Sequence, residues 1–420
     1  MDISKKILYK NIIFYFFGIL VGGFINFFSI PVIIEIYGVE SYGQFSLIQN
    51  IVLIIISFGS GWLSQNILRF NDNSLTFKVN IILLYYITIL PILIISLFSI
   101  VLIKYNLTIA VISSLTIAIG GITAIINSFY QSTFNAKKNV FFDIFRVTGF
   151  IFCVYLFSKI KGGDLLTYLV ISFFFSYLIA FVLKIKNDFI LIRKVFFIYI
   201  RNIKQKTIIK VFKRNLNFLH YGLPLSLWFT FSSILNVGDR YIIDLFIDKS
   251  AVGNYSAIYD LIYKGVSISF TPILSAGYPI ISKLYNQGKV AKAFEFIYKL
   301  IFFEVLILVI GVFTLSYFNL DKFFLEKIVR LQYSDTNAKL VLLILIGAII
   351  WQIAMLVHKP LELKLKTKQM LLFVTIALIF NLLFNFLLVP QYGTIMSGYA
   401  TIISASIYLL LCFSYSFFKK

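Results

Sequence analysis

Twelve continuous apolar runs divide the chain, and most of them match the thickness of a lipid bilayer. A membrane-spanning helix needs roughly 20 apolar residues, and only short polar segments separate these runs. We place the runs at residues 12–34, 45–68, 79–103, 108–130, 140–158, 165–183, 222–246, 255–281, 296–318, 338–357, 370–389 and 395–418. Because a backbone crossing lipid must satisfy its hydrogen bonds internally, each run is predicted to be a helix.

Composition excludes a water-soluble globule. Of the 420 residues, 60% are hydrophobic and only 13% are charged, and the mean hydropathy is +0.94. This leaves too little polar surface to face water. Strands of an outer-membrane barrel would alternate in polarity every second residue, and these runs do not. We therefore expect an all-α integral membrane protein with about twelve transmembrane helices.

The distribution of Lys and Arg predicts the orientation. Counted over alternate connecting segments and span ends, 28 basic residues fall on one side of the membrane and eight on the other, with Arg240 and Lys264 inside spans. Basic segments stay on the cytoplasmic side, so both termini are predicted to be cytoplasmic. The net charge of +21 then reflects contact with membrane lipids, and no nucleic acid partner is implied.

A basic segment at residues 184–221 divides the chain into halves of six runs each. It holds ten Lys and Arg against one acid, Asp188. We predict an N-terminal six-helix lobe at 1–183, a cytoplasmic linker at 184–221 and a C-terminal six-helix lobe at 222–420. Within the linker, apolar residues such as Ile208 and Phe212 alternate with basic ones, which is typical of a helix lying in the headgroup plane.

An internal repeat supports two related lobes. Shifting the sequence by 210 residues places Gly43-Gln44-Phe45-Ser46 on Gly253-Asn254-Tyr255-Ser256, and Asn50 on Asp260. Each copy lies near the end of the first span of its half. Such a parallel repeat is common in transporters, where the two lobes enclose a cavity.

Ionisable residues within the spans are the candidate functional residues, because each costs about 2.5–3.5 kcal/mol at a helix centre. They are Asp143, Arg146, Asp239, Arg240, Asp244, Asp260, Lys264 and Glu304. Structural explanations also exist for several of them. Arg146 is near a span end and one turn from Asp143, so it can extend to the interface or pair with that carboxylate.

The other intramembrane charges have local alternatives too. Asp260 and Lys264 have the i,i+4 spacing of a helix salt bridge. Asp244 lies one turn after Arg240 and could neutralise it.

The sequence contains no phosphate-binding loop, nucleophile–base pattern or metal-ligand spacing. His220 and His358 lie at span ends without nearby ligand residues, and Cys153 and Cys412 lie within spans. We therefore expect no enzyme activity, no cofactor and no metal site.

Several short motifs resemble one family across nearly the whole chain. They are Tyr37-Gly38-Val39-Glu40-Ser41-Tyr42-Gly43, Gly222-Leu223-Pro224, Asp239-Arg240-Tyr241, Val252-Gly253-Asn254-Tyr255, Asn381 and Asn385 before Val389-Pro390-Gln391-Tyr392-Gly393, and Gly398-Tyr399-Ala400-Thr401. In order and spacing they are similar to the O-antigen type oligosaccharide flippases of the polysaccharide transporter family. That family belongs to the multidrug, oligosaccharidyl-lipid and polysaccharide exporter superfamily.

The resemblance implies a fold and an activity. The fold would be MATE-like, and the activity would be transfer of an undecaprenyl-diphosphate-linked oligosaccharide from the cytoplasmic to the outer leaflet of the bacterial inner membrane. It implies alternating access, an H⁺ or Na⁺ gradient as the coupling partner, and a polysaccharide polymerase acting afterwards in O-antigen or other surface polysaccharide biosynthesis. Positive groups would bind the diphosphate, so the substrate-binding candidates are Arg240, Lys264, Asp239, Asp260 and Arg146.

Two alternatives remain. An O-antigen polymerase or related glycosyltransferase also has many Phe-rich spans, but such enzymes usually present a large outer loop, whereas the largest loop here is basic and cytoplasmic. A drug exporter of the same superfamily would share the lobes but should line its cavity with acids. This chain instead offers Arg240 and Lys264.

The predicted orientation can be tested by labelling. A cysteine introduced within residues 184–217 should be protected from a membrane-impermeant thiol reagent in intact spheroplasts, because this segment is predicted to be cytoplasmic. A known internal cysteine serves as the control for leakage. Labelling of the introduced site while the control stays unlabelled would contradict the entire predicted orientation.

Overall fold

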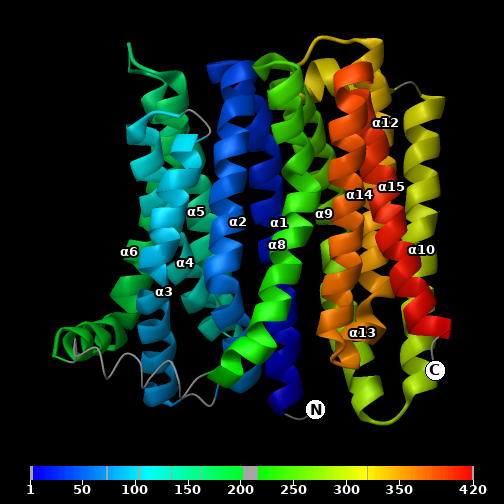
Figure 1. Cartoon of the computed structure of the whole chain (residues 1–420). Helices are drawn as coiled ribbons and strands as arrows, with labels where there is room; N and C mark the ends of the chain where they lie inside the picture. The colour runs from blue at the N-terminus through cyan, green and yellow to red at the C-terminus, as the bar shows by residue number, and fades with distance from the viewer. Residues whose placement is uncertain are drawn as a thin grey trace. The chain divides into compact units, whose positions relative to one another are not determined.

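The protein is described by a computed structural model that covers residues 3–71, 74–102, 105–133, 135–160, 162–201, 216–318 and 320–418. Throughout this part of the chain the regular elements are helices, and no strand occurs among them (Figure 1). The expected all-α fold class is confirmed.

Each of the twelve apolar runs corresponds to one long helix in the described part of the chain. The long helices are α1 (Ile3–Tyr37), α2 (Val39–Phe70), α3 (Leu75–Leu102), α4 (Leu107–Ser132), α5 (Ala136–Phe157), α6 (Leu165–Arg201), α8 (Leu216–Phe246), α9 (Lys249–Asn286), α10 (Val290–Tyr317), α12 (Asp335–Val357), α14 (Thr367–Tyr392) and α15 (Ile395–Phe413). Four short helical segments complete the description: α11 (Leu320–Phe323), the π-helix η1 (Phe324–Val329), α13 (Lys359–Leu363) and the π-helix η2 (Ser414–Phe418).

Ten of these helices, within the described residues, are long and apolar enough to cross a membrane. The two long helices outside that set are α8 and α9. Both carry charged residues, among them Asp239 and Arg240 on α8 and Asp260 and Lys264 on α9. Several of the charged candidate residues therefore lie on one pair of consecutive helices.

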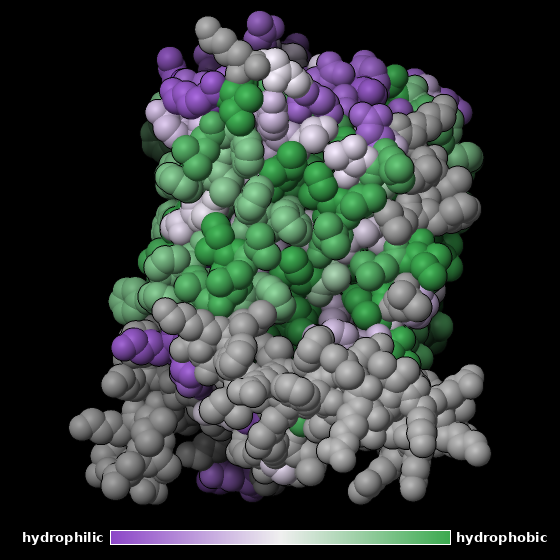
Figure 2. All heavy atoms as spheres, turned by 90° about the vertical axis from the view of Figure 1, so that its left-hand side faces the viewer, coloured by the Kyte–Doolittle hydropathy of each residue, from purple (hydrophilic) through white to green (hydrophobic). Residues whose placement is uncertain are grey.

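The helices form two compact units, and the first comprises Met1–Gly18 and Ile48–Thr230. Within it α4 packs against α3, α5 and α6, and its core includes Trp62, Leu84 and Phe129. Large apolar side chains such as Phe152 and Tyr155 of α5 point outward. The face seen in Figure 2 carries a broad band of hydrophobic side chains, with hydrophilic residues gathered at one end of the band. Such an apolar exterior is what lipid solvates and water does not.

The second unit comprises Ile19–Leu47 and Phe231–Lys420. Here α12 packs against α9, α10 and α15, and α14 packs against α15 (Figure 1). The helices α1, α2 and α8 each pass from one unit into the other.

The helix α6 continues to Arg201, so the first part of the segment predicted as a linker is helical. Most of the predicted interfacial helix lies in 202–215, outside the described residues. The division of the chain at 184–221 stays a prediction.

Two copies of the internal repeat meet within the second unit. A Cβ atom added at Gly43 of α2 would lie 2.6 Å from the Cα of Gly253 of α9, and one added at Gly253 would lie 2.3 Å from the carbonyl oxygen of Val39. Only glycine allows the two backbones to approach this closely. The turn that leads into α2 also requires glycine, because Gly38 has φ of 82°. This crossing places the first turns of α2 beside α9, which positions the groups described next.

Candidate functional site

A buried ion pair joins α8 to α9 inside the second unit. The Arg240 guanidinium donates from Nη2 to Asp260 Oδ1 at 2.7 Å and from Nη1 to Asp260 Oδ2 at 3.2 Å. Two parallel bonds of this kind are the strongest arrangement available to an arginine and a carboxylate. The side chain of Arg240 is 1% exposed and that of Asp260 is 17% exposed. The guanidinium of Arg240 is therefore almost completely enclosed, whereas the carboxylate of Asp260 keeps a small exposed area.

The first turns of α2 complete this pair. Ser46 Oγ accepts a hydrogen bond from Arg240 Nη1, and the Tyr42 hydroxyl donates to Asp260 Oδ2 at 2.6 Å. The guanidinium carbon also lies 5.1 Å from the centre of the Tyr259 ring, where the ring quadrupole attracts a cation. Each charge is thus stabilised by its partner and by at least one further group.

One predicted local pairing is replaced by this longer-range one. Arg240 takes as its partner Asp260, twenty residues further along the chain. Asp244, which was expected to be able to neutralise Arg240, interacts instead with the charge of Lys249. Lys264, one turn after Asp260, adds a favourable electrostatic interaction with the same carboxylate.

Asp239 is fully buried beside Arg240 but faces different partners. Its Oδ2 accepts a hydrogen bond from the Tyr255 hydroxyl, and its Oδ1 accepts one from the Arg240 backbone N–H at 2.9 Å. Tyr255 also lies beside Thr401 of α15, whose hydroxyl donates to the Ser397 carbonyl at 2.9 Å. Through Tyr255 this carboxylate is therefore close to the C-terminal helix α15.

Three tyrosines line up along one side of α9 at i,i+4 spacing. The rings of Tyr255 and Tyr259 are 5.8 Å apart, and those of Tyr259 and Tyr263 are stacked at 5.6 Å. The α8 residue Asn236 accepts from Tyr259 at 3.4 Å and donates to the Tyr263 hydroxyl at 3.3 Å. Such rings carry both an apolar face and a polar tip into the helix interface.

The family-like motif residues of α14 and α15 form a buried polar network. Asn385 donates to the Asn381 carbonyl at 2.9 Å and accepts from Ser397 at 2.7 Å, while Asn381 donates to Ser404 at 3.1 Å. All four side chains are buried. Fully satisfied networks of this kind fix the packing of two helices.

Arg146 belongs to the first unit. Its guanidinium carbon is 5.2 Å from the centre of the Tyr177 ring. Nearby, Lys184 is buried and donates to the Thr123 carbonyl at 3.3 Å, and Asp143 acts electrostatically on Lys184. Four of the five predicted site residues, Asp239, Arg240, Asp260 and Lys264, are thus brought together, and the fifth belongs to a separate charged group.

Glu304 on α10 is a further buried acid. It is fully buried, and neither of its carboxyl oxygens has a hydrogen-bond partner among the residues that the structure describes. A carboxylate in this position would be very costly, so the side chain is expected to be in its neutral form. It lies outside the α8–α9 cluster and takes no part in the ion pair.

Tyr42, Ser46, Tyr259 and Tyr263 belong to the site but were not predicted from the sequence. The i,i+4 spacing of the tyrosines is visible in the sequence, but in so aromatic a chain it does not stand out. Tyr42 precedes the repeat and Ser46 ends it, and both become partners of the ion pair only through the glycine crossing of α2 and α9. Among the described residues, no three His, Cys, Asp or Glu side chains come together in a way that could hold a metal ion.

Comparison with known proteins gives one family and several solved structures. The profile of the family described as polysaccharide biosynthesis protein matches residues 8–285. A search of curated protein sequences gives no significant match.

Solved structures show the same fold at low sequence identity. The lipid II flippase MurJ in an inward closed conformation has a TM-score of 0.66 at 17% identity, covering 95% of this chain and 86% of its own. An inward-facing multidrug resistance MATE family transporter of the MOP superfamily has a TM-score of 0.64 at 12% identity, covering 94% and 92%. A MOP superfamily transporter from Pyrococcus furiosus has a TM-score of 0.62 at 12% identity, covering 97% and 94%. The chain has the fold of these proteins.

Asp260→Ala is expected to destabilise the protein by about 3–5 kcal/mol, because it leaves the buried Arg240 charge without its carboxylate. The matched control is Glu295→Ala. It breaks another 2.7 Å ion pair, to Lys299, but the side chains of that pair are 70% and 62% exposed. An exposed pair is worth only about 0–1 kcal/mol. Thermal unfolding in detergent measures both variants.

A double variant separates charge from packing. Arg240→Met combined with Asp260→Leu should recover part of the stability lost in Asp260→Ala, since the buried guanidinium is removed together with its carboxylate. If Asp260→Ala unfolds at the same temperature as the Glu295→Ala control, the ion pair does not hold α8 and α9 together as described.

Proposed function

The chain belongs to the polysaccharide biosynthesis protein family, and from this premise we propose that it is a flippase for lipid-linked oligosaccharides. In this proposal it moves undecaprenyl-diphosphate-linked repeat units from the cytoplasmic to the outer leaflet of the bacterial inner membrane by alternating access. The units would then be polymerised into O-antigen or another surface polysaccharide. The observation that carries the proposal is the Arg240–Asp260 ion pair. The Asp260 carboxylate binds the intramembrane guanidinium of Arg240, and in this proposal an anionic substrate replaces that carboxylate.

The diphosphate needs positive charge within the membrane, and Arg240 is suited to supply it. The guanidinium is planar and binds phosphate oxygens through two bonds at once. Its two terminal nitrogens are engaged by Asp260 and Ser46, while Nε has no hydrogen-bond partner within the described residues. In our proposal the phosphate displaces Asp260, which is the more exposed member of the pair.

Lys264 adds a second cation one helical turn from Asp260. Because Lys264 already acts on the Asp260 carboxylate, displacement of that carboxylate would leave two positive charges for the diphosphate. Asp239, held by Tyr255, keeps the local charge balanced and does not compete directly for the guanidinium. Arg146 is proposed as a separate contact of the first unit with the substrate's charged part.

We further propose that transport is coupled to an H⁺ or Na⁺ gradient. Ionisable groups inside a span are the usual elements of ion pathways. Asp239 is such a group, and Tyr255, which hydrogen-bonds to it, lies beside Thr401 of α15. A change in protonation or ion binding at Asp239 would alter the hydrogen bonding beside Arg240, which provides a physical route for coupling.

Deletion of the gene is expected to stop surface polysaccharide formation, because the lipid-linked units would remain on the cytoplasmic side. The measurement combines immunoblotting of surface polysaccharide with a leaflet-selective assay of the lipid-linked unit in membrane vesicles. Re-expression of the wild-type chain is the control and should restore both.

Other outcomes would identify the alternative functions. Single units that reach the outer leaflet unpolymerised would indicate a polymerase or glycosyltransferase. Unchanged polysaccharide together with increased sensitivity to cationic drugs would indicate a drug exporter.

Substitution of Arg240 should affect export in a graded way. Arg240→Ala is expected to reduce export at least tenfold at normal protein level, whereas Arg240→Lys should retain part of it, because lysine keeps the charge but loses the two-bond geometry. Export in the complemented deletion strain measures both. The double variant Arg240→Met with Asp260→Leu controls for stability, since it should accumulate and fail to export. Wild-type export by Arg240→Ala would make Arg240 a structural charge only.

A further inference from the structure

Glu304 lies at the middle of α10 and takes no part in the proposed binding of the substrate. The helix has 28 residues, so at 1.5 Å per residue this side chain is about 20 Å from either end. Its exposed fraction is 0%. An acid at the centre of a transmembrane helix is costly to retain, which makes it a candidate for a function.

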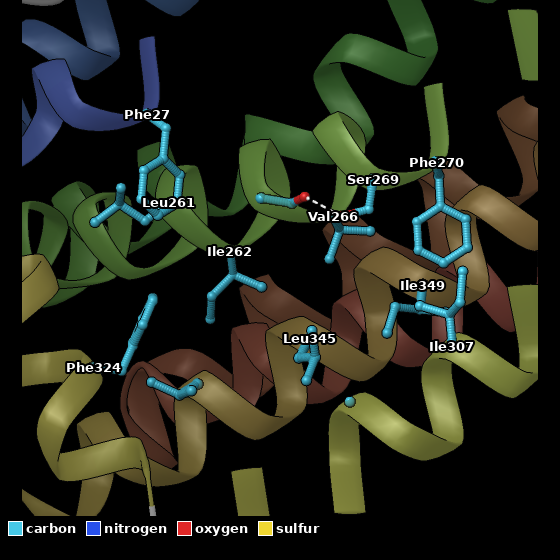
Figure 3. Close-up of a pocket in the computed structure, with 13 residues that line it drawn as sticks. Phe27, Leu261, Ile262, Val266, Ser269, Phe270, Ile307, Phe324, Leu345 and Ile349 are labelled. Atoms are coloured by element: carbon cyan, nitrogen blue, oxygen red, sulfur yellow. Dashed lines mark hydrogen bonds between the residues drawn. The ribbon is translucent and has the colours of Figure 1, made fainter. Parts of the chain in front are cut away.

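Glu304 belongs to the stripe of α10 that packs against α9 and α12. Leu300, Glu304 and Ile307 follow the i+3 and i+4 spacing of one helix face. Leu300 contacts α9, since a Cβ atom added at Gly277 would lie 2.6 Å from its Cδ1. Ile307 and Ile349 of α12 line one apolar pocket and both point into it (Figure 3). The carboxyl group therefore lies between contacts to two neighbouring helices, on the side away from lipid.

Packing alone does not explain an acid at this position. The residues around Glu304 in the sequence point outward, and Phe302, Phe303 and Val305 are all exposed. Among the α10 side chains that the structure describes, Glu304 is the only one beyond Ile297 that is buried. A leucine would fill the same space without burying a polar group, so the carboxyl group is expected to have a chemical role.

The two helices beside Glu304 offer no charge to neutralise it. Residues 265–282 of α9 and 340–357 of α12 contain no charged residue, and Tyr278 is the one ionisable side chain in these two stretches. Along these helices the nearest charged or titratable side chains on either side of the stretches are those of Lys264, Lys283, Lys339 and His358.

The charges of α10 and α11 are also accounted for. On α10 the charged residue nearest to Glu304 in the sequence is Lys299, which forms an exposed ion pair with Glu295 at 2.7 Å. The short helix α11, which packs against α10, carries Asp321 and Lys322 beyond the end of α10. Glu304 therefore lies in a purely apolar part of the unit.

Glu304 differs in this respect from the acids of α8 and α9. Asp260 accepts hydrogen bonds from Arg240, and Asp239 accepts one from Tyr255. Such bonds stabilise the ionised form of a carboxyl group. Neither oxygen of Glu304 has a hydrogen-bond partner among the residues that the structure describes. In this arrangement its charge can be removed only by a bound cation, of which the proton is the simplest.

The isolation of Glu304 favours H⁺ over Na⁺ as that cation. A hard metal cation requires several oxygen ligands, whereas a proton bonds to one carboxyl oxygen and needs no others. Within the described part of the chain, no group of three acidic, histidine or cysteine side chains is present to assist. Release of the proton requires water at the α10 stripe, because a carboxylate is stable only when it is solvated or paired.

We propose that Glu304 is a proton-binding site in the centre of the second unit, additional to the charged cluster of α8 and α9, and that export uses the proton it exchanges. Glu304 holds the proton in the arrangement described and releases it when water reaches the α10 stripe during the transport cycle. The use in export rests on the proposed function, whereas the proton binding does not.

Labelling with dicyclohexylcarbodiimide, an apolar reagent, tests the proton binding on the purified full-length protein in nanodiscs. The acid proton moves to a nitrogen of the reagent, the carboxyl oxygen bonds to its central carbon, and the adduct rearranges to a stable N-acylurea. The reaction therefore requires the protonated acid, and mass spectrometry locates the adduct.

Glu295, the exposed and ion-paired acid of the same helix, is the internal control. At about pH 7, where an exposed glutamate is ionised, the adduct at Glu304 should exceed that at Glu295 at least tenfold. It should decrease at least tenfold by about pH 10, where the site loses its proton, and replacing KCl by NaCl at constant pH should not change it.

Glu304→Gln tests the use of the proton in export. Glutamine has nearly the shape of the protonated acid but cannot release a proton, so the variant should accumulate normally. In inverted membrane vesicles, an imposed pH gradient should accelerate transfer of the lipid-linked unit at least tenfold for the wild type and leave Glu304→Gln unaffected. The matched control Glu295→Gln should respond as the wild type does.

Each remaining outcome decides one part of the proposal. Absence of an adduct at Glu304, an adduct that does not change with pH, or protection by Na⁺ would overturn the proton site, and all three measurements use the wild-type protein. A wild-type response to the gradient by Glu304→Gln would overturn the role of the proton in export. If labelling occurs as expected but gene deletion leaves export intact, the proton site stands and the flippase function fails.

Discussion

The Arg240–Asp260 ion pair is the interaction on which the arrangement of the second unit depends. Two opposite charges within a span are tolerable only when they neutralise each other and their remaining groups are hydrogen-bonded. Ser46, Tyr42 and the Tyr259 ring meet that requirement here. Because these partners come from α2, α8 and α9, satisfying one arginine also determines how three helices approach.

The close approach of α2 and α9 at Gly43 and Gly253 makes this possible. Without side chains at these positions, the two backbones come near enough for Tyr42 and Ser46 to reach groups on α8 and α9. Next to Arg240, Asp239 accepts a hydrogen bond from Tyr255, which lies beside Thr401 of α15. These polar groups lie on the inside of the unit, while apolar side chains such as Phe302 face outward. That distribution is the one that lipid as solvent requires.

The sequence by itself determined the all-α membrane fold class and the positions of the long helices. Twelve apolar runs of bilayer length predict twelve helices, since no other backbone structure of that length survives in lipid. The scarcity of intramembrane charges also identified Asp239, Arg240, Asp260 and Lys264 as candidates, because each is costly wherever the helices pack. These conclusions depend on the local composition of each segment and on lipid as its solvent. The apolar composition itself indicates that solvent.

Only the tertiary structure decided which of these residues meet. The candidate partners from sequence spacing were one helical turn away: Asp244 for Arg240 and Lys264 for Asp260. Spacing along a single helix shows only which residues of that helix are neighbours. The observed partner of Arg240 is twenty residues away and becomes a neighbour because α8 and α9 pack side by side. Ser46 is 194 residues from Arg240 and reaches it only through the crossing of α2 and α9. Such contacts depend on how helix surfaces fit together, and that fit is a property of the whole fold and not of any segment.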